Sequence, residues 1–177
     1  GVRAHNVAAE DTRMGMDMAK LAETLDDMPG MDDLLSRSGL EFMQDMIAGR
    51  LPGPPIGAAL GFAPVSVEEG RVVFEGAPQF TVTNPMSAVH GGWYGAILDS
   101  CMGCAVMTTV PRGSVYTTLE YKVNITRAIP LGTRVRAIGT VDHAGRSTGV
   151  ASGEIRGIGD DRLYATSSTT CLIMKMA

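Results

Sequence analysis

The sequence predicts an α+β domain in which a sheet of about six strands wraps around one central helix. The first observation behind this is the stretch 92–110, where Asp99 is the single charged residue and almost every other position is apolar or small. Such a stretch is typical of a helix that is buried on all sides. The second observation is a set of strand-like segments on both sides of this helix. A helix buried all round needs a sheet wide enough to cover it, so both observations predict the same architecture.

Each strand-like segment is bounded by turn residues. Glu69-Gly70 separates the first two segments, and later turns are marked by Pro130-Leu131-Gly132, Ala144-Gly145 and Gly159-Asp160-Asp161. The predicted strands are 62–67, 71–75, 116–125, 133–142, 148–156 and 163–174. A sheet of this kind has exposed edges, so we expect the chain to associate with a second copy of itself.

The N-terminal third has a different pattern. Apolar residues at three- and four-residue spacing predict helices at 14–27 and 31–47, with the second ending at Gly49. Residues 51–55 are rich in Pro and Gly and predict a stiff linker. We therefore divide the chain into an N-terminal helical extension with its linker, residues 1–56, and a main domain, residues 57–177. The first dozen residues show no periodicity, and we expect no regular structure there.

Composition limits the possible partners. The 177 residues are 45% hydrophobic and 19% charged, as in an ordinary globular domain. The net charge of −4 comes from the first 60 residues, which carry five basic and ten acidic side chains. Because no stripe of Lys and Arg could neutralise a phosphate backbone, we expect no nucleic-acid partner. The sequence lacks a long apolar run and a signal-peptide pattern, so we expect a cytoplasmic protein without a membrane partner.

The three cysteines do not indicate a disulfide framework or a metal site. Cys101 and Cys104 form a C-x-x-C pattern, but they lie in the apolar helical stretch and no second ligand pair accompanies them. Together with Cys171 they are interpreted as small core residues. We therefore expect neither a bound metal nor a cofactor.

Asp99 is the sharpest anomaly, because an unpaired carboxylate in a buried helix costs several kcal/mol. It could cap a loop, pair with an Arg or serve a functional site. The preceding His90-Gly91-Gly92 leads into the helix without bulky side chains, so the first backbone N–H groups are free to bind an anion or an oxyanion.

Two motifs resemble a known family. The segment Asn84-Pro85-Met86-Ser87-Ala88-Val89-His90-Gly91-Gly92, followed by Ile97-Leu98-Asp99, resembles the signature region of PaaI-type hotdog thioesterases, with matching spacings. Further similarity occurs at 117–124, at Arg127-Ala128 and at Gly145-Arg146-Ser147, so the resemblance covers about residues 57–174. The sequence departs from the family pattern at Ser87, where many relatives have Gly, and at Ile97-Leu98.

The resemblance implies a hotdog fold, in which a curved antiparallel sheet of about five to six strands wraps around the central helix. It also implies assembly into a dimer or tetramer and hydrolysis of an acyl-CoA thioester to the free acid and CoA. It implies that Asp99 is the general base or nucleophile and that the Gly91 N–H binds the thioester oxygen. Asn84 would orient the carbonyl or the water, and Thr118, with Thr117 as the alternative, would hydrogen-bond the water or Asp99. The substrate-binding residues that it implies are His90, Gly92, Arg146 and Ser147.

Helix geometry adds a constraint on how this site is assembled. Gly91 and Asp99 are eight residues apart, which is about 12 Å along one helix. Reacting groups must approach to roughly 3 Å, so one chain cannot supply both. We therefore predict a site between two subunits, with Asn84 and Gly91 of one chain facing Asp99 and Thr118 of the other.

Two other functions are compatible with the same fold. A hotdog-fold enoyl-CoA hydratase or dehydratase would use His90 as its base, although the Asp-x-Asn-Pro-hydrophobic-His motif of that class is absent. A non-catalytic acyl-CoA binding protein would not need Asp99. His5 and His143 have no recognisable nucleophile partner, and we expect His90 to stabilise its turn. Residues that could line an acyl pocket are Trp93, Tyr94, Met102 and Met107.

Overall fold

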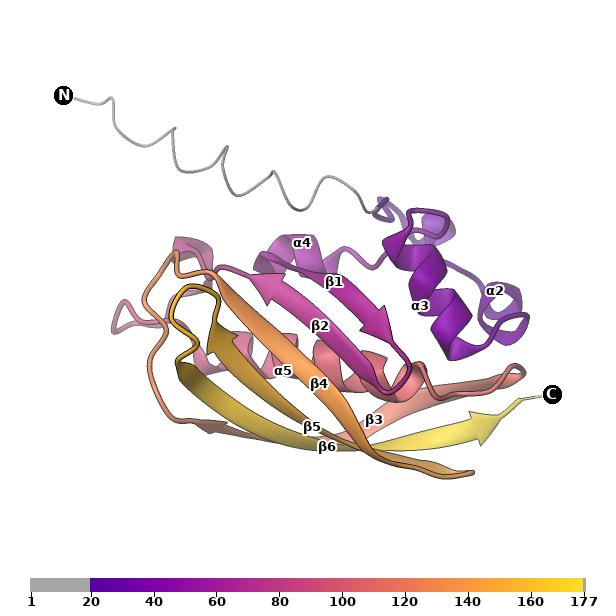
Figure 1. The fold of residues 1–177 in the computed structure, drawn as a ribbon. Helices are drawn as coiled ribbons and strands as arrows, with labels where there is room; N and C mark the ends of the chain where they lie inside the picture. The colour runs from indigo at the N-terminus through magenta and orange to yellow at the C-terminus, as the bar shows by residue number, and fades with distance from the viewer. Residues whose placement is uncertain (1–19, 177) are drawn as a thin grey trace.

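The computed structural model describes residues 20–176, and across this part of the chain a six-stranded sheet curves around one long helix (Figure 1). The strand order is β1-β2-β4-β5-β6-β3, and every neighbouring pair is antiparallel. The predicted α+β architecture, a curved antiparallel sheet around a central helix, is confirmed. Strands β1 and β3 form the two edges of the sheet.

The six predicted strands are all present, with bounds shifted by one or two residues at most. The first two are joined at Gly70, whose φ of 75° explains the glycine in this turn. Their bounds are β1 (Phe62–Glu68), β2 (Arg71–Gly76), β3 (Ser114–Ile125), β4 (Val135–Ala144), β5 (Thr148–Gly157) and β6 (Leu163–Lys175).

Helix α5 (Gly91–Met107) fills the curve of the sheet, and ten of its 17 residues are buried. Glycines in the sheet allow the close approach of helix and strands. A Cβ atom on Gly139 would overlap the carbonyl group of Cys101, and one on Gly153 would lie 2.9 Å from Cγ of Met102. A side chain at either of these two glycines would therefore push the helix away from the sheet.

The prediction of one helix at 31–47 was wrong, because this segment forms two helices, α2 (Met31–Leu35) and α3 (Gly39–Ile47). The break has a local cause: the Ser38 side chain accepts a hydrogen bond from the Glu41 N–H, and the Glu41 carboxylate accepts one from the Ser38 N–H. This capping box starts a new helix at Gly39.

The helix predicted at 14–27 was also wrong for the residues that the structure describes, where only the short 3-10 helix η2 (Leu25–Asp27) occurs. Residues 14–19, the unstructured start and His5 lie outside the described residues. The segment predicted as a linker contains buried Leu51 and is followed by the short helix α4 (Ile56–Leu60). The division of the chain at residue 56 stays a prediction.

The N-terminal segment, residues 20–56, is fixed to the main body by backbone hydrogen bonds. The Gly39 N–H donates to the Val110 carbonyl at 2.9 Å, and the Gly113 N–H donates to the Leu35 carbonyl at 3.0 Å. Helix α3 contacts both β1 and α5, and Figure 1 shows α3 and α4 beside β1. The segment thus covers the side of α5 that the sheet leaves open.

Two further expectations concern the burial of the cysteines and the presence of a membrane-spanning helix. Cys101 and Cys171 are fully buried and Cys104 is half-buried, so their interpretation as core residues is confirmed. Within residues 20–176, no helix combines the length and the apolar character that a membrane crossing requires.

The close contact between α5 and the sheet predicts the effect of one added methyl group. Gly139→Ala should lower the free energy of unfolding by about 1–3 kcal/mol or more, because its Cβ would overlap the backbone of Cys101. Gly159→Ala is the matched control, since no atom lies within 4 Å of its Cβ position. Urea denaturation of both variants checks this, and equal stabilities would contradict the packing described.

Candidate active site

Asp99 lies on a half-buried stripe of α5, between the edge strand β3 and the N-terminal segment. It is half-buried, whereas its neighbours Leu98 and Cys101 are fully buried. Among the described residues no Lys, Arg or His forms an ion pair with it, so neither an Arg partner nor a loop cap explains this carboxylate. Asp99 is therefore a partly solvated carboxylate without a neutralising cation.

Thr118 is the hydrogen-bond partner of Asp99. Its hydroxyl Oγ1 donates to Oδ1 of Asp99 at 3.0 Å, which confirms the predicted contact and places it within one chain. The second carboxylate oxygen, Oδ2, has no hydrogen-bond partner among the described residues. Thr118 thus fixes one oxygen of the carboxylate and leaves the other available to a water molecule or a substrate.

A β-bulge sets the direction of Thr118. In the pairing of β3 with β6, Thr118 lies opposite Cys171 and Glu120 lies opposite Thr170, so Leu119 has no partner. An unpaired residue reverses which residues face the helix. Tyr116 and Thr118 therefore face α5 on one side of the bulge, and Tyr121 faces it on the other side.

The N-terminus of α5 has the predicted arrangement of donors, with one difference. His90 is the N-cap, and its Nδ1 accepts a hydrogen bond from the Gly92 N–H at 2.9 Å. The Gly92 donor is thus occupied, and His90 stabilises its turn as expected. The Gly91 N–H has no partner among the described residues and is the donor that an oxyanion could use.

Asn84 is held next to this helix end by a closed loop. Thr83 pairs with Val89, and the Asn84 Oδ1 accepts hydrogen bonds from the N–H groups of Met86 and Ala88 at 2.9 and 3.1 Å. Its Nδ2 makes no hydrogen bond with the described residues, so Asn84 can act as a donor. Ser87 in this loop has a φ of 59°, in the left-handed region that favours glycine.

The predicted site residues therefore fall into two groups within one chain. Asn84, His90, Gly91 and Gly92 lie at the N-terminus of α5, whereas Asp99 and Thr118 lie further along it. Because α5 is unbroken from Gly91 to Met107, the eight residues between Gly91 and Asp99 span about 12 Å.

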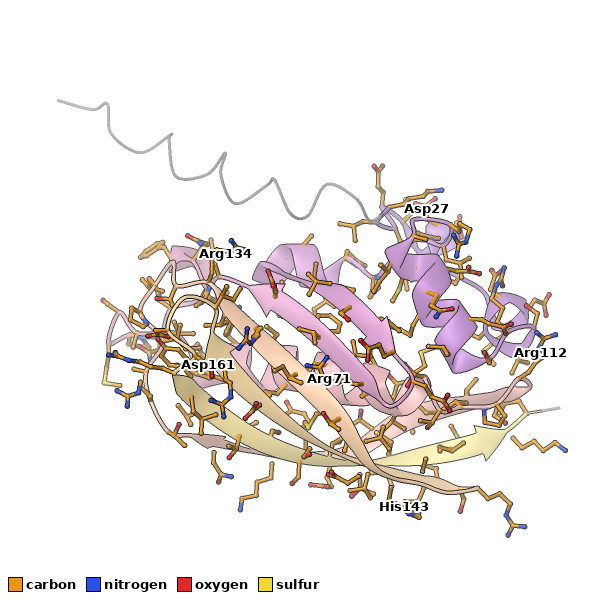
Figure 2. The ribbon with its side chains drawn as sticks, viewed as in Figure 1. Asp27, Arg71, Arg112, Arg134, His143 and Asp161 are labelled. Carbon is orange, nitrogen blue, oxygen red and sulfur yellow. The ribbon has the colours of Figure 1, made fainter. Side chains whose placement is uncertain are left out.

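Arg146 and Ser147 belong to the β4–β5 turn and are exposed. The Ser147 carbonyl accepts a hydrogen bond from the Ile173 N–H at 2.9 Å. The next residue, Thr148, lies opposite Leu172, which lies opposite Thr117, so the turn is two strand spacings, about 10 Å, from β3. Among the described residues, Arg146 and Ser147 form no hydrogen bond with either group of site residues. His143 is exposed at the end of β4 and lies far from the helix N-terminus (Figure 2).

A cavity of about 260 Å³ lies beside Asp99 and Thr118. Ser100, Cys104 and Tyr116 line it near the carboxylate, and Met46 and Ile56 line it from the N-terminal segment. Sequence reasoning did not find these residues. The alternation of β3 could have indicated Tyr116, but no local pattern indicates that the N-terminal segment contributes.

The residues expected to line a pocket have other roles. Trp93, Tyr94 and Met102 are buried in the core, and neither they nor Met107 line the cavity. The Trp93 Nε1 donates to the Leu60 carbonyl at 2.8 Å, and the Tyr94 hydroxyl accepts a hydrogen bond from the Ile129 N–H at 2.8 Å. The aromatic rings of Trp93 and Tyr94 pack within the core, and their polar atoms form hydrogen bonds with backbone groups.

The thiols near Asp99 have low reactivity. Burial, followed by the nearby Asp99 carboxylate, raises the pKa of Cys104 to about 12. Burial likewise raises the pKa values of Cys101 and Cys171. A thiol with such a pKa stays protonated at neutral pH and is a poor nucleophile or metal ligand. Within residues 20–176, no group of three or more His, Cys, Asp or Glu residues could hold a metal ion.

Comparison with known families identifies the protein's relatives. A family model described as the thioesterase superfamily matches residues 86–164, a range that contains the whole of α5 and Thr118. A phenylacetic acid degradation-related protein of Ralstonia eutropha is 27% identical; the match covers 73% of this chain and 97% of that one, with a TM-score of 0.67. Over these ranges the chain is similar to PaaI-type hotdog thioesterases.

Two other solved structures are similar to this chain. A thioesterase family protein of Silicibacter pomeroyi is 25% identical over 68% of this chain and 90% of that one, with a TM-score of 0.64. A Streptococcus mutans protein solved with acetyl-CoA is 23% identical over 66% and 90%, with a TM-score of 0.60. No curated protein matches the sequence.

The raised thiol pKa values predict that the protein resists alkylation while folded. At pH 8 iodoacetamide should leave Cys104 unmodified, because its pKa of about 12 keeps the thiol protonated. After unfolding in guanidinium chloride, all three cysteines should react. Intact-mass spectrometry measures both states, and rapid alkylation of Cys104 in the folded protein would contradict the prediction.

Proposed function

We propose that the protein hydrolyses acyl-CoA thioesters to the free acid and CoA. The carbonyl carbon gains a bond to an oxygen and loses its bond to sulfur, and the CoA thiolate takes up the proton. Asp99 either removes a proton from the attacking water or attacks the carbonyl itself to form an anhydride that water then opens. A thioester is activated enough for one positioned carboxylate and one N–H donor to suffice.

The environment of Asp99 carries this proposal. The carboxylate is half-buried beside an apolar cavity, it has no ion-pair partner among the described residues, and Thr118 orients one of its oxygens. A carboxylate in these surroundings is free to accept a proton or to attack, because no cation neutralises it. The hydrogen bond from Thr118 restricts the rotation of the carboxylate, which favours a single geometry of attack.

The oxyanion donors would come from a second copy of the chain. Strand β3 is a free sheet edge, and Leu119, Tyr121 and Ile125 on it are 60%, 45% and 48% exposed. Antiparallel pairing of two β3 strands about a twofold axis would place the two α5 helices in opposite directions. Gly91 of the partner subunit would then approach Asp99, and its N–H would stabilise the developing oxyanion.

Other residues would position the substrate in this arrangement. The Nδ2 of Asn84, whose Oδ1 is held by its own loop, would donate to the thioester carbonyl or to the water. His90 would act through the turn that presents Gly91, and Gly92 would allow the substrate to approach the helix end. Arg146 and Ser147, in the exposed turn, would contact the CoA portion. The acetyl-CoA held by the Streptococcus mutans protein supports a CoA thioester as substrate.

The first prediction from this proposal concerns Asp99. Asp99→Asn keeps the shape and the hydrogen-bond acceptor for Thr118 but removes the base, so kcat/KM should fall at least about a hundredfold. Release of free thiol from a panel of acyl-CoAs measures this, and the melting temperature shows that the variant is folded. Binding of acyl-CoA without thiol release by the wild type would instead indicate a non-catalytic binding protein.

The second prediction concerns the Gly91 N–H. Gly91→Pro removes this donor at the first position of a helix, where Pro is well tolerated, and the extended conformation of His90 (φ −62°, ψ 136°) suits a residue before Pro. We expect kcat to fall by about 10²–10³.

Gly91→Ala is the matched control for the proline variant. It retains the N–H, and its Cβ would make an ordinary contact with Ile125 at 3.6 Å. The alanine variant should therefore keep far more activity than the proline variant. Equal losses in the two variants would show that the glycine, and not its N–H, matters.

A further inference from the structure

The cavity beside Asp99 has walls from two parts of the chain. One wall belongs to the helix and sheet, with Cys104 on α5, Tyr116 on β3 and Phe62 on β1. The opposite wall belongs to the N-terminal segment, with Leu21, Met46 and Ile56. The catalytic carboxylate proposed above lies at the boundary of a space that the hotdog elements alone do not enclose.

The lining of the cavity is suited to a hydrocarbon group. Its side chains are mostly aliphatic or aromatic, and the few polar ones, including Asp99, Ser100 and Thr118, lie close together on α5 and β3. The Ser100 hydroxyl is already used, since it donates to the Ala96 carbonyl at 2.8 Å. Deeper in the cavity, no charged side chain is available to bind a polar or ionised acyl group.

The size of the cavity limits what can enter. An apolar cavity of about 150 Å³ is enough to bind benzene. By the same ratio of volume to carbon atoms, the cavity of 260 Å³ here has room for about ten carbons. A medium-length alkyl chain or an aromatic ring with a short spacer fits this space, whereas a hexadecanoyl chain does not.

The backbone hydrogen bonds described above join the N-terminal segment to the main body, and further hydrogen bonds within the segment keep the shape of this wall. The Gly53 N–H donates to the Lys20 carbonyl at 2.7 Å, and the Ala22 N–H donates to the Gly53 carbonyl at 3.0 Å. Asp45 accepts hydrogen bonds from Arg37 and Arg50, which fixes the C-terminal half of α3 beside Met46. A wall fixed in this way can define a maximum length for the bound chain.

We propose that the N-terminal segment sets the acyl specificity of the site, with Ile56 and Met46 as the residues that limit chain length. This inference rests on the thioesterase activity proposed above. The substrate class is an uncharged acyl group of up to about ten carbons, aliphatic or aryl. The acyl chain enters the cavity beside Asp99 of one subunit, and the CoA portion extends away from it.

Ile56 is the best position for a test, because its side chain lines the cavity yet is 52% exposed, so a larger residue does not disturb the core. Ile56→Trp should fill part of the cavity. The ratio of kcat/KM for decanoyl-CoA to that for butyryl-CoA should fall at least about tenfold relative to the wild type. Ile56→Ala should shift the preference toward longer chains.

Leu25→Trp is the matched control. Leu25 belongs to the same segment, is 90% exposed and does not line the cavity, so the chain-length profile should be that of the wild type. Straight-chain acyl-CoAs from acetyl to hexadecanoyl and phenylacetyl-CoA form the substrate panel. Identical profiles for the wild type and both Ile56 variants would overturn the inference while leaving the thioesterase proposal standing.

A binding measurement separates this inference from the proposed activity. Non-hydrolysable ketone analogues of the same acyl-CoAs, titrated by calorimetry, report the chain-length preference without any turnover. If the wild type releases no thiol from any substrate, the thioesterase proposal fails. A loss of long-chain analogue binding in Ile56→Trp but not in Leu25→Trp would still support the acyl cavity, and equal binding by all variants would overturn it.

Discussion

The close contact between α5 and the sheet is the constraint on which the rest of the structure depends. Gly139, Gly149 and Gly153 lie directly under the helix, where a Cβ atom would meet helix atoms. This contact buries most of the helix surface and leaves a half-buried stripe beside the edge strand β3, which carries Asp99, Ser100 and Cys104. In the middle of α5 a partly solvated carboxylate can exist only along this stripe, because the other faces are packed more fully against strands.

The N-terminal segment completes the site by covering that stripe. The curved sheet ends at β1 and β3, and the segment lies over the gap between these edges, where it contacts both α5 and β1. It encloses an apolar space beside the carboxylate without burying the carboxylate completely. In this account the sheet and α5 supply the reactive group, the segment supplies the acyl cavity, and a second subunit supplies the oxyanion donor.

The sequence was sufficient to predict the sheet and the central helix, because their hydrophobic patterns are long and strong. The family resemblance added Thr118 as the partner of Asp99, and the structure confirms that hydrogen bond. The break between α2 and α3 was missed although Ser38-Gly39-Leu40-Glu41 has the capping-box pattern. A helical periodicity that continued across the break concealed it.

Other features depend on tertiary structure and have no local signal. The bulge at Leu119 is visible only in the pairing of β3 with β6, yet it decides which residues of β3 face the helix. Likewise, the Pro- and Gly-rich residues 51–55 resemble a linker in sequence, but Gly53 and Pro54 line the cavity. Such roles follow from where distant segments pack and cannot be deduced from composition.

The central claim is that each active site combines Asp99 of one subunit with Gly91 of another, and mixed dimers test it most directly. Asp99→Ala and Gly91→Pro protomers, unfolded together in equal amounts and refolded, should form heterodimers as half of the population. Each heterodimer then has one intact site, so thioesterase activity should return to about one quarter of the wild-type value. Activity no higher than the average of the two separate variants, with heterodimers confirmed by native mass spectrometry, would contradict a shared site.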